Sequence, residues 1–255
     1  GWDGTGLVAR QNPLSPGRHL YITDRLWRDW ASVRFLVPPS PNLTILEEGG
    51  KLPQVSSDLG LSSRRRTETE VMLILWPYED YNQYLILLPV GSIIAVQEGS
   101  LERGDLEKEA RLLYITFTAT PTTTPAGEPE ARFGKGLTLV DHQVVVVSPQ
   151  ELRLSLLWRA ESEIETDYTV FVHLTRDDAI VAQVDSPPAG GYYPTSLWRV
   201  GDIVDDEHTL ALPEPYEPVE HRIIVGLYQL ETLQRLQVLD KNGKPVSDHL
   251  ILDEM

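Results

Sequence analysis

The sequence predicts a two-domain α+β protein, in which a small α/β domain is followed by an antiparallel β-sandwich of the jelly-roll or immunoglobulin-like kind. Three observations lead to this prediction. In the first half of the chain, apolar runs alternate with segments of helical periodicity, whereas the second half has short alternating runs with almost no helical periodicity. A stretch rich in threonine and proline separates the two patterns. The length of 255 residues also favours two domains.

The border between the domains lies in the segment Ala119–Glu130. Its threonines, prolines and glycine interrupt every apolar period, which favours an extended and solvated linker. We therefore expect the α/β domain at residues 1–120, the linker at 121–133 and the sandwich at 134–255. No repeat of fixed period occurs on either side, which argues against a solenoid or a propeller.

The first domain is predicted to alternate strands with two helices around a mostly parallel sheet. Asp24 is the expected N-cap of a helix whose apolar residues recur from Leu26 to Val37, and Tyr78–Leu88 is a second helix that ends before Pro89. The predicted strands are His19–Thr23, Leu43–Leu46, Glu70–Trp76, Ser92–Val96 and Leu112–Phe117.

The second domain is predicted to contain short strands divided by Pro, Gly and Asp turns. Asp240–Gly243 reads as a tight turn because Asn-Gly tolerates positive φ. The acidic stretch Asp202–His208 offers oxygen ligands but matches no calcium-loop pattern, so we expect a solvated turn there. The predicted strands are Leu152–Trp158, Tyr168–Leu174, Ile180–Val184, Thr209–Leu212, Arg222–Tyr228, Leu233–Val238 and Leu250–Leu252.

Composition excludes several classes of partner and chemistry. The net charge of −16 and the single short basic run Arg64–Arg66 argue against nucleic acid. The absence of cysteine excludes disulfides and thiol nucleophiles. The apolar stretch Tyr84–Val96 is too short for a bilayer and contains Pro89 and Gly91, so we expect a soluble chain. Its beginning, Gly1–Gly6, lacks the features of a leader peptide, and we expect a piece of a longer protein.

Sequence motifs give no catalytic residue, no metal ligand and no cofactor. The chain has no Gly-x-Ser-x-Gly elbow, no His-Glu-x-x-His or His-x-x-x-His spacing and no glycine fingerprint after a strand. Glycoside hydrolysis stays an open alternative, because it needs only two well-placed carboxylates and the chain has 38 acidic residues.

The loop Asp185–Trp198 is the one candidate binding segment. Its prolines, glycines and aromatic residues could form a sugar-stacking platform, or the aromatics could plug the end of the sandwich core. Both readings stay open. The candidate ligand-binding residues are Asp185, Tyr192, Tyr193, Thr195 and Trp198.

Five segments of the second half resemble a known family. The segments are Leu-Leu-Trp-Arg-Ala at 156–160, Asp-Tyr-Thr-Val-Phe-Val-His-Leu at 167–174, Ala-Gln-Val-Asp-Ser-Pro-Pro at 182–188, Tyr-Pro-Thr-Ser-Leu-Trp at 193–198 and Val-Gly-Leu-Tyr at 225–228. Together they resemble the C-terminal soluble region of bacterial membrane glycosyltransferases of the dolichyl-phosphate-mannose protein mannosyltransferase type. In the first half, Ser32–Leu36 and Leu88–Gly91 resemble the segment that joins this region to the last membrane helix, whereas Arg64–Arg66 has no counterpart.

The resemblance implies an extracytoplasmic and non-catalytic accessory region. In such enzymes the catalytic acids belong to the membrane-embedded portion, so no catalytic residue is transferred to this chain. The implied partners are a glycan or glycosylation acceptor and that missing membrane portion. A structural or protein-interaction module without a ligand is the alternative, and a glycan-active hydrolase is the third.

Overall fold

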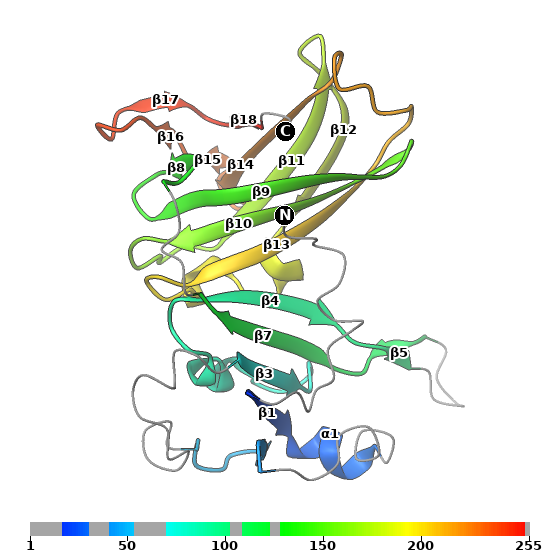
Figure 1. The fold of residues 1–255 in the computed structure, drawn as a ribbon, viewed down its shortest axis with the longest axis vertical. Helices are drawn as coiled ribbons and strands as arrows, with labels where there is room; N and C mark the ends of the chain where they lie inside the picture. Colours follow the sequence, from blue (N-terminus) through cyan, green and yellow to red (C-terminus); the bar gives the residue numbers. More distant parts are fainter. Residues whose placement is uncertain (1–16, 31–40, 54–69, 103–108, 123–127, 253–255) are drawn as a thin grey trace. The chain divides into compact units, whose positions relative to one another are not determined.

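The computed structural model describes residues 17–30, 41–53, 70–102, 109–122 and 128–252. The chain divides into two compact units, residues 1–123 and 124–255, and both consist mainly of β-strands (Figure 1). Among the described residues, no helix is both long and apolar enough to cross a bilayer. The residues around Arg64–Arg66, those at the N-terminus and the predicted helical residues after Trp30 lie outside the described ranges.

The first unit contains one mixed sheet. Its central strand pair is β1 (Arg18–Thr23) and β3 (Glu70–Leu75), which run parallel, and β1 also runs parallel to β2 (Leu43–Leu46). On the other side, β7 (Ile115–Pro121) lies antiparallel between β3 and β4 (Ser92–Glu98). Parallel pairing is therefore confined to one side of the sheet. A separate small hairpin joins β5 (Leu101–Glu102) to β6 (Arg111–Leu112).

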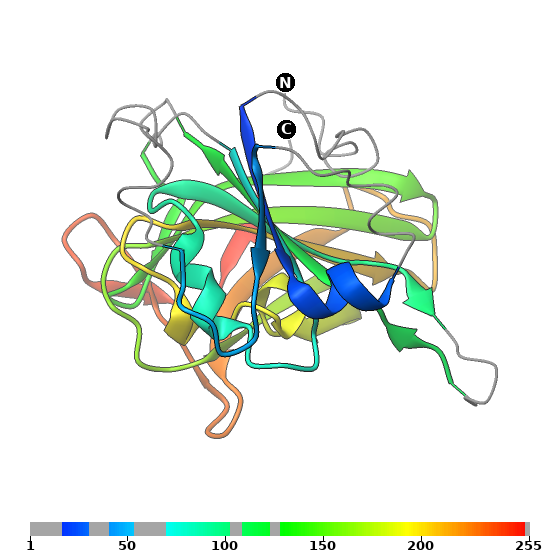
Figure 2. The ribbon, with the colours of Figure 1, turned by 90° about the horizontal axis from the view of Figure 1, so that it is seen from below.

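The described helices of the first unit are shorter than the sequence predicts. β1 runs directly into α1 (Asp24–Asp29; Figure 2), and its N-cap is Thr23 rather than Asp24. The Thr23 hydroxyl makes no capping bond because it accepts the Trp76 N–H at 3.1 Å. The predicted helix Tyr78–Leu88 is only a 3₁₀ turn, η1 (Asn82–Leu87). The residue before Pro89 is restricted to extended conformations, which ends the turn early.

The second unit contains two antiparallel sheets, as the sequence predicts. In the first sheet the strand order is β17-β16-β8-β9-β10-β13, and in the second it is β12-β11-β14-β15, with β18 also paired to β14. The first sheet consists of β8 (Ala131–Phe133), β9 (Leu137–Ser148), β10 (Glu151–Ala160), β13 (Ile203–Ala211), β16 (Val238–Leu239) and β17 (Pro245–Ser247). The second consists of β11 (Tyr168–Arg176), β12 (Ala179–Ser186), β14 (Arg222–Gln229), β15 (Gln234–Arg235) and β18 (Leu250–Leu252).

The core of the second unit follows from strict alternation along its central strands. Every second residue of β10, from Leu152 to Ala160, is buried. The inward residues of β11 and β14 are fully buried as well, among them Val170, Val172 and Val225. Trp158 from β10 contacts Phe133 from β8 edge to face, with ring centroids 5.3 Å apart. These side chains form the apolar layer between the two sheets.

Several boundaries in the second unit differ from the sequence-based prediction. β9 was not predicted, because its four consecutive valines do not alternate with polar residues. β8 lies inside the segment expected to be linker, and β13 begins at Ile203 rather than Thr209. The turn Asp240–Gly243 is confirmed, with Gly243 at φ +78° and its N–H donating to the Asp240 carbonyl at 2.9 Å.

A substitution at Gly226 of β14 would test the packing on the outer face of the second sheet. A Cβ atom at this position would lie 2.4 Å from Cζ of Phe171, its cross-strand neighbour, which is buried. We expect Gly226→Ala to lower the free energy of unfolding by about 1–3 kcal/mol, because overpacking forces the ring to move. Adding Phe171→Leu should recover part of this loss in chemical denaturation. A Gly226→Ala protein as stable as the wild type would contradict the described packing.

Candidate functional site

The loop between β12 and β13 carries four of the five predicted binding residues. It contains two short 3₁₀ turns, η2 (Pro188–Gly191) and η3 (Thr195–Leu197), and returns the chain from the second sheet to the first. The loop is anchored by hydrogen bonds to two buried carboxylates, those of Asp202 and Asp206.

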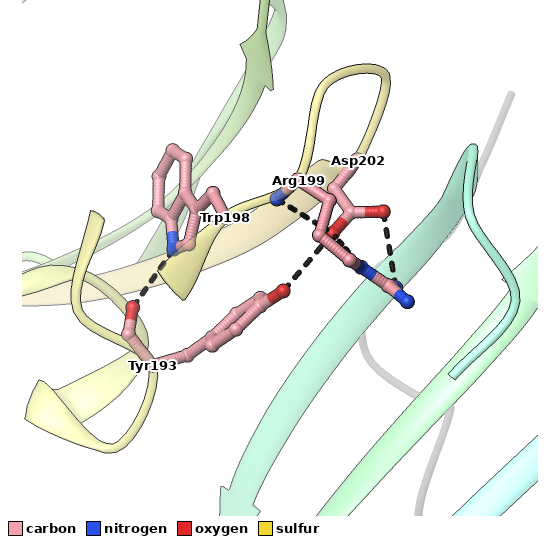
Figure 3. Close-up of polar contacts among 4 residues, drawn as sticks. All are labelled: Tyr193, Trp198, Arg199 and Asp202. Atoms are coloured by element: carbon pink, nitrogen blue, oxygen red, sulfur yellow. Dashed lines mark hydrogen bonds and ion pairs between the residues drawn. The ribbon is translucent and has the colours of Figure 1, made fainter. Parts of the chain in front are cut away.

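Asp202 fixes the second half of the loop (Figure 3). Its Oδ2 accepts hydrogen bonds from the Tyr193 hydroxyl at 3.0 Å, the Arg199 backbone N–H at 3.1 Å and the Arg199 Nε at 3.0 Å. The Trp198 indole N–H donates to the Tyr193 carbonyl at 2.9 Å. Burial, followed by the charge of Asp202, raises the pKa of Tyr193, so the phenol remains a neutral donor.

Asp206 fixes the first half of the loop. Its Oδ1 accepts the Ala189 N–H at 2.9 Å, and its Oδ2 lies 2.7 Å from His208 Nε2. The other ring nitrogen of His208 lies 3.3 Å from the Ser186 hydroxyl. Ala189 has φ +52°, a left-handed conformation that is unfavourable for a residue with a Cβ atom. The buried hydrogen bond that the Ala189 N–H donates to Asp206 holds the backbone in this strained conformation.

The acidic stretch Asp202–His208 is therefore not the solvated turn that its composition predicts. It leads into and forms most of β13, and Asp202, Asp206 and His208 are almost fully buried. A carboxylate can be buried where several donors replace its lost water, and each of these two aspartates has such donors. Within the described part of the chain, no group of three or more His, Asp or Glu side chains could hold a metal ion.

Asp205 lies on the opposite face of β13 from Asp206. Its Oδ1 accepts the Ser155 hydroxyl at 2.6 Å, and its side chain is mostly buried. Burial raises the pKa of Asp205 to about 6, although the Ser155 hydrogen bond opposes this shift. This carboxylate therefore weakens the fold at neutral pH.

Only two of the predicted binding residues reach the surface. Tyr193 and Thr195 are fully buried and Trp198 is 3% exposed, so their side chains fill the interior. The Thr195 hydroxyl donates to the Thr166 carbonyl at 2.7 Å. Tyr192 is half-buried, and Asp185 is exposed on the outer face of β12. Sugar stacking on exposed ring faces is thus restricted to Tyr192 within this loop.

Asp185 belongs instead to a cluster on the outer face of the second sheet. The cluster, here named the Asp185 face, consists of Phe171, His173, Asp185, Tyr228 and Arg235. His173 Nε2 lies 3.3 Å from Asp185 Oδ1, and the Arg235 guanidinium lies 4.4 Å from the Phe171 ring centroid. The Phe171 and His173 rings are 4.9 Å apart, and both residues lie on the face of β11 away from the core.

The electrostatics of the Asp185 face leave one polar atom without a partner. Burial lowers the pKa of His173, and the charge of Asp185 opposes this only in part, so the ring is biased towards its neutral form. His173 Nδ1 is buried and has no hydrogen-bond partner within the described ranges. The Tyr228 pKa is raised, first by burial and then by the Asp185 charge. The face therefore combines a carboxylate, a guanidinium, a phenol and a free imidazole nitrogen.

Sequence reasoning found Asp185 but missed the other members of this face. Phe171, Tyr228 and Arg235 come from three different strands, so no local motif joins them. The available signal was strand alternation, which places Phe171 and His173 on the outer face of β11.

Comparisons with known proteins identify no family. No protein-family model and no curated protein matches the chain. Among solved structures, β-glucuronidase from Bacteroides uniformis and its calcium-binding mutant each match at 16% identity and a TM-score of 0.28. Both matches cover 49% of this chain and 14% of the other. The β-glucuronidase 2 structure bound to cyclophellitol-6-carboxylate aziridine matches at 15% identity and the same TM-score. At this TM-score the similarity carries no information on function.

The Asp202 contacts predict a large and local stability effect. We expect Asp202→Ala to reduce the free energy of unfolding by about 3 kcal/mol, the lower end of the range for a broken buried pair, because Arg199 is partly exposed. Tyr193→Phe should cost about 1 kcal/mol, since one hydrogen bond is lost. The exposed neighbour Glu207→Ala is the matched control and should change stability by no more than about 0.5 kcal/mol. Equal effects of the Asp202 and Glu207 variants in urea denaturation would refute the anchoring role.

The raised pKa of Asp205 predicts how stability changes with pH. Since the folded state holds its proton more tightly than the unfolded state, the stability contribution of Asp205 falls as pH rises from about 4 through about 6. We expect Asp205→Asn to be more stable than the wild type at pH 7, by at most about 3 kcal/mol, and equally stable at pH 4. Denaturation at both pH values checks this. A stabilisation that is the same at pH 4 and pH 7 would exclude titration as its cause.

Proposed function

We propose that this chain is the non-catalytic, extracytoplasmic accessory region of a membrane-bound glycosyltransferase-like protein, and that it binds a glycan or the glycosylation acceptor on the Asp185 face. The observation that carries the proposal is the cluster itself, in which the exposed Asp185 lies 3.3 Å from His173 Nε2 and shares its face of the sheet with Tyr228 and the Arg235 guanidinium. The sequence resemblance supports the assignment, because three of its matching segments lie on β11, β12 and β14, the strands that form this face.

The chemistry of the Asp185 face suits a polyhydroxylated ligand. Sugar hydroxyls both donate and accept, and the face offers the acceptor oxygens of Asp185 and those guanidinium N–H groups of Arg235 that do not bind Asp248, whose Oδ2 lies 3.2 Å from Nη1. Opposite charges lie close together, which favours a neutral ligand over a strongly charged one. Half-buried Tyr228 also provides an aromatic surface within a polar surround.

We also propose that the sandwich is immunoglobulin-like rather than a jelly roll. In immunoglobulin-type topology, strand B pairs with A and E in one sheet, while C pairs with F in the other. The pairings of β10 with β9 and β13, and of β11 with β14, follow this order. The additional strands β12 and β18 then take the positions next to C and F.

A purely structural module is the second candidate. The specific observation in its favour is the burial of Tyr193, Thr195 and Trp198, which makes most of the loop an architectural element. In that case the missing membrane-embedded portion of the same protein would be its partner, and no glycan would bind.

A glycan-array screen distinguishes the two candidates. We expect the wild-type chain to bind a defined set of glycans and Asp185→Asn to reduce this binding at least tenfold, because the acceptor charge is lost. Glu231→Gln removes another exposed carboxylate, one in the turn between β14 and β15, and should bind as the wild type does. Thermal denaturation checks that all three proteins are folded.

Two results would count against glycan binding at this face. Absence of any glycan signal for the folded wild type would favour the structural module. Equal loss of binding in both variants would show that the signal depends on net charge rather than on Asp185.

A further inference from the structure

A second surface of the sandwich has the opposite electrostatic character. A cavity of about 350 Å³ opens on the first sheet of the second unit. Three cationic side chains line it in a protein whose formal net charge is −16. Its polar and charged lining residues are Arg132, Lys135, Thr138, Arg159 and Glu161.

Strand register places the cationic groups side by side. Arg132 of β8 is the cross-strand partner of Thr138 of β9, and Thr138 is the partner of Arg159 of β10. Cross-strand partners point to the same face of a sheet, and here that is the face away from the core. Lys135 comes from the β8–β9 turn, which is fixed by Gly134 at φ +55° and by its N–H bond to the Gln237 carbonyl at 2.8 Å.

The charges in this pocket do not cancel. Glu161 Oε1 accepts hydrogen bonds from Arg159 Nε at 2.7 Å and from the Thr138 hydroxyl at 3.1 Å, so this carboxylate is committed to Arg159. Within the described ranges neither Arg132 nor Lys135 has an ion-pair partner. The pocket therefore carries two uncompensated positive charges, one on β8 and one in the β8–β9 turn.

We infer that the pocket formed by Arg132, Lys135 and Arg159 binds a phosphate group. Guanidinium groups bind phosphate oxygens in pairs, lysine adds a point charge, and the Thr138 hydroxyl is a further donor. Several cations around one cavity suit a group that carries up to two negative charges and several acceptor oxygens better than a single carboxylate. The phosphate can be free in solution or part of a lipid headgroup, because the chemistry recognised is the same.

This inference is independent of the proposed glycan site. The pocket lies on the sheet that contains β8, β9 and β10, whereas the Asp185 face lies on the other sheet. The two sites share no residue, so absence of binding at one site would leave the proposal for the other unaffected.

The test is a phosphate titration of the full chain, followed by NMR amide shifts and by calorimetry. We expect inorganic phosphate to shift the amides around Gly134–Gly136, and we expect Arg132→Ala with Lys135→Ala to weaken binding at least tenfold. Arg153→Ala is the matched control, because Arg153 lies on the same face of β10 but outside the pocket. Glu161→Gln should strengthen binding several-fold, since Arg159 is released from its partner.

Vesicles of phosphatidylcholine with and without phosphatidic acid separate the two sources of phosphate. Cosedimentation that requires phosphatidic acid and is lost in the protein with Arg132→Ala and Lys135→Ala would assign the site to a lipid headgroup, and binding of inorganic phosphate alone would assign it to a soluble phosphate. The inference is overturned if neither probe binds, or if Arg153→Ala weakens binding as much as the pocket variants do.

Discussion

The second unit depends on the burial of two carboxylates at the start of β13. Desolvating a carboxylate is costly unless donors replace its water; Asp202 accepts four hydrogen bonds, and Asp206 has two partners, the Ala189 N–H and His208 Nε2. The donors come almost entirely from the crossover loop, so the loop and the strand stabilise each other. The strained φ of Ala189 is tolerated only because its N–H is held by Asp206.

This constraint decides which side chains of the loop and of β12 reach the surface of the second unit. The loop aromatics are drawn inward to meet Asp202, which removes Tyr193 and Trp198 from the surface. β12 illustrates the division with two adjacent residues. Ser186 points inward to His208, and Asp185 points outward to His173, because successive residues of a strand alternate between faces. The two proposed binding sites accordingly lie on the outer faces of the two sheets.

The sequence predicts best those elements whose burial alternates strictly. β10, β11 and β14 were predicted within a few residues, because each has one apolar face. β9 was missed because its half-exposed valines show no period, and its long pairing with β10 becomes visible only in the structure. The first part of β13, residues 203–208, was mistaken for a turn because its charge is compensated by donors that lie distant in sequence. In the first unit the 3₁₀ helix before Pro89 was mistaken for an α-helix. The spacing of its apolar residues does not distinguish hydrogen bonds between residues three apart from those between residues four apart.

The same reasoning explains why neither surface site has a sequence motif. The Asp185 face and the Arg132 pocket both arise from register, which brings residues of neighbouring strands into a row. The strong negative charge of the whole chain does not prevent a positive pocket, because at physiological ionic strength exposed charges beyond about 8 Å are largely screened. What matters for an anion at Arg132 is the immediate neighbourhood, in which the one carboxylate, Glu161, is already committed to Arg159. Local pairing therefore decides which charge a ligand meets, and the net charge of the protein does not.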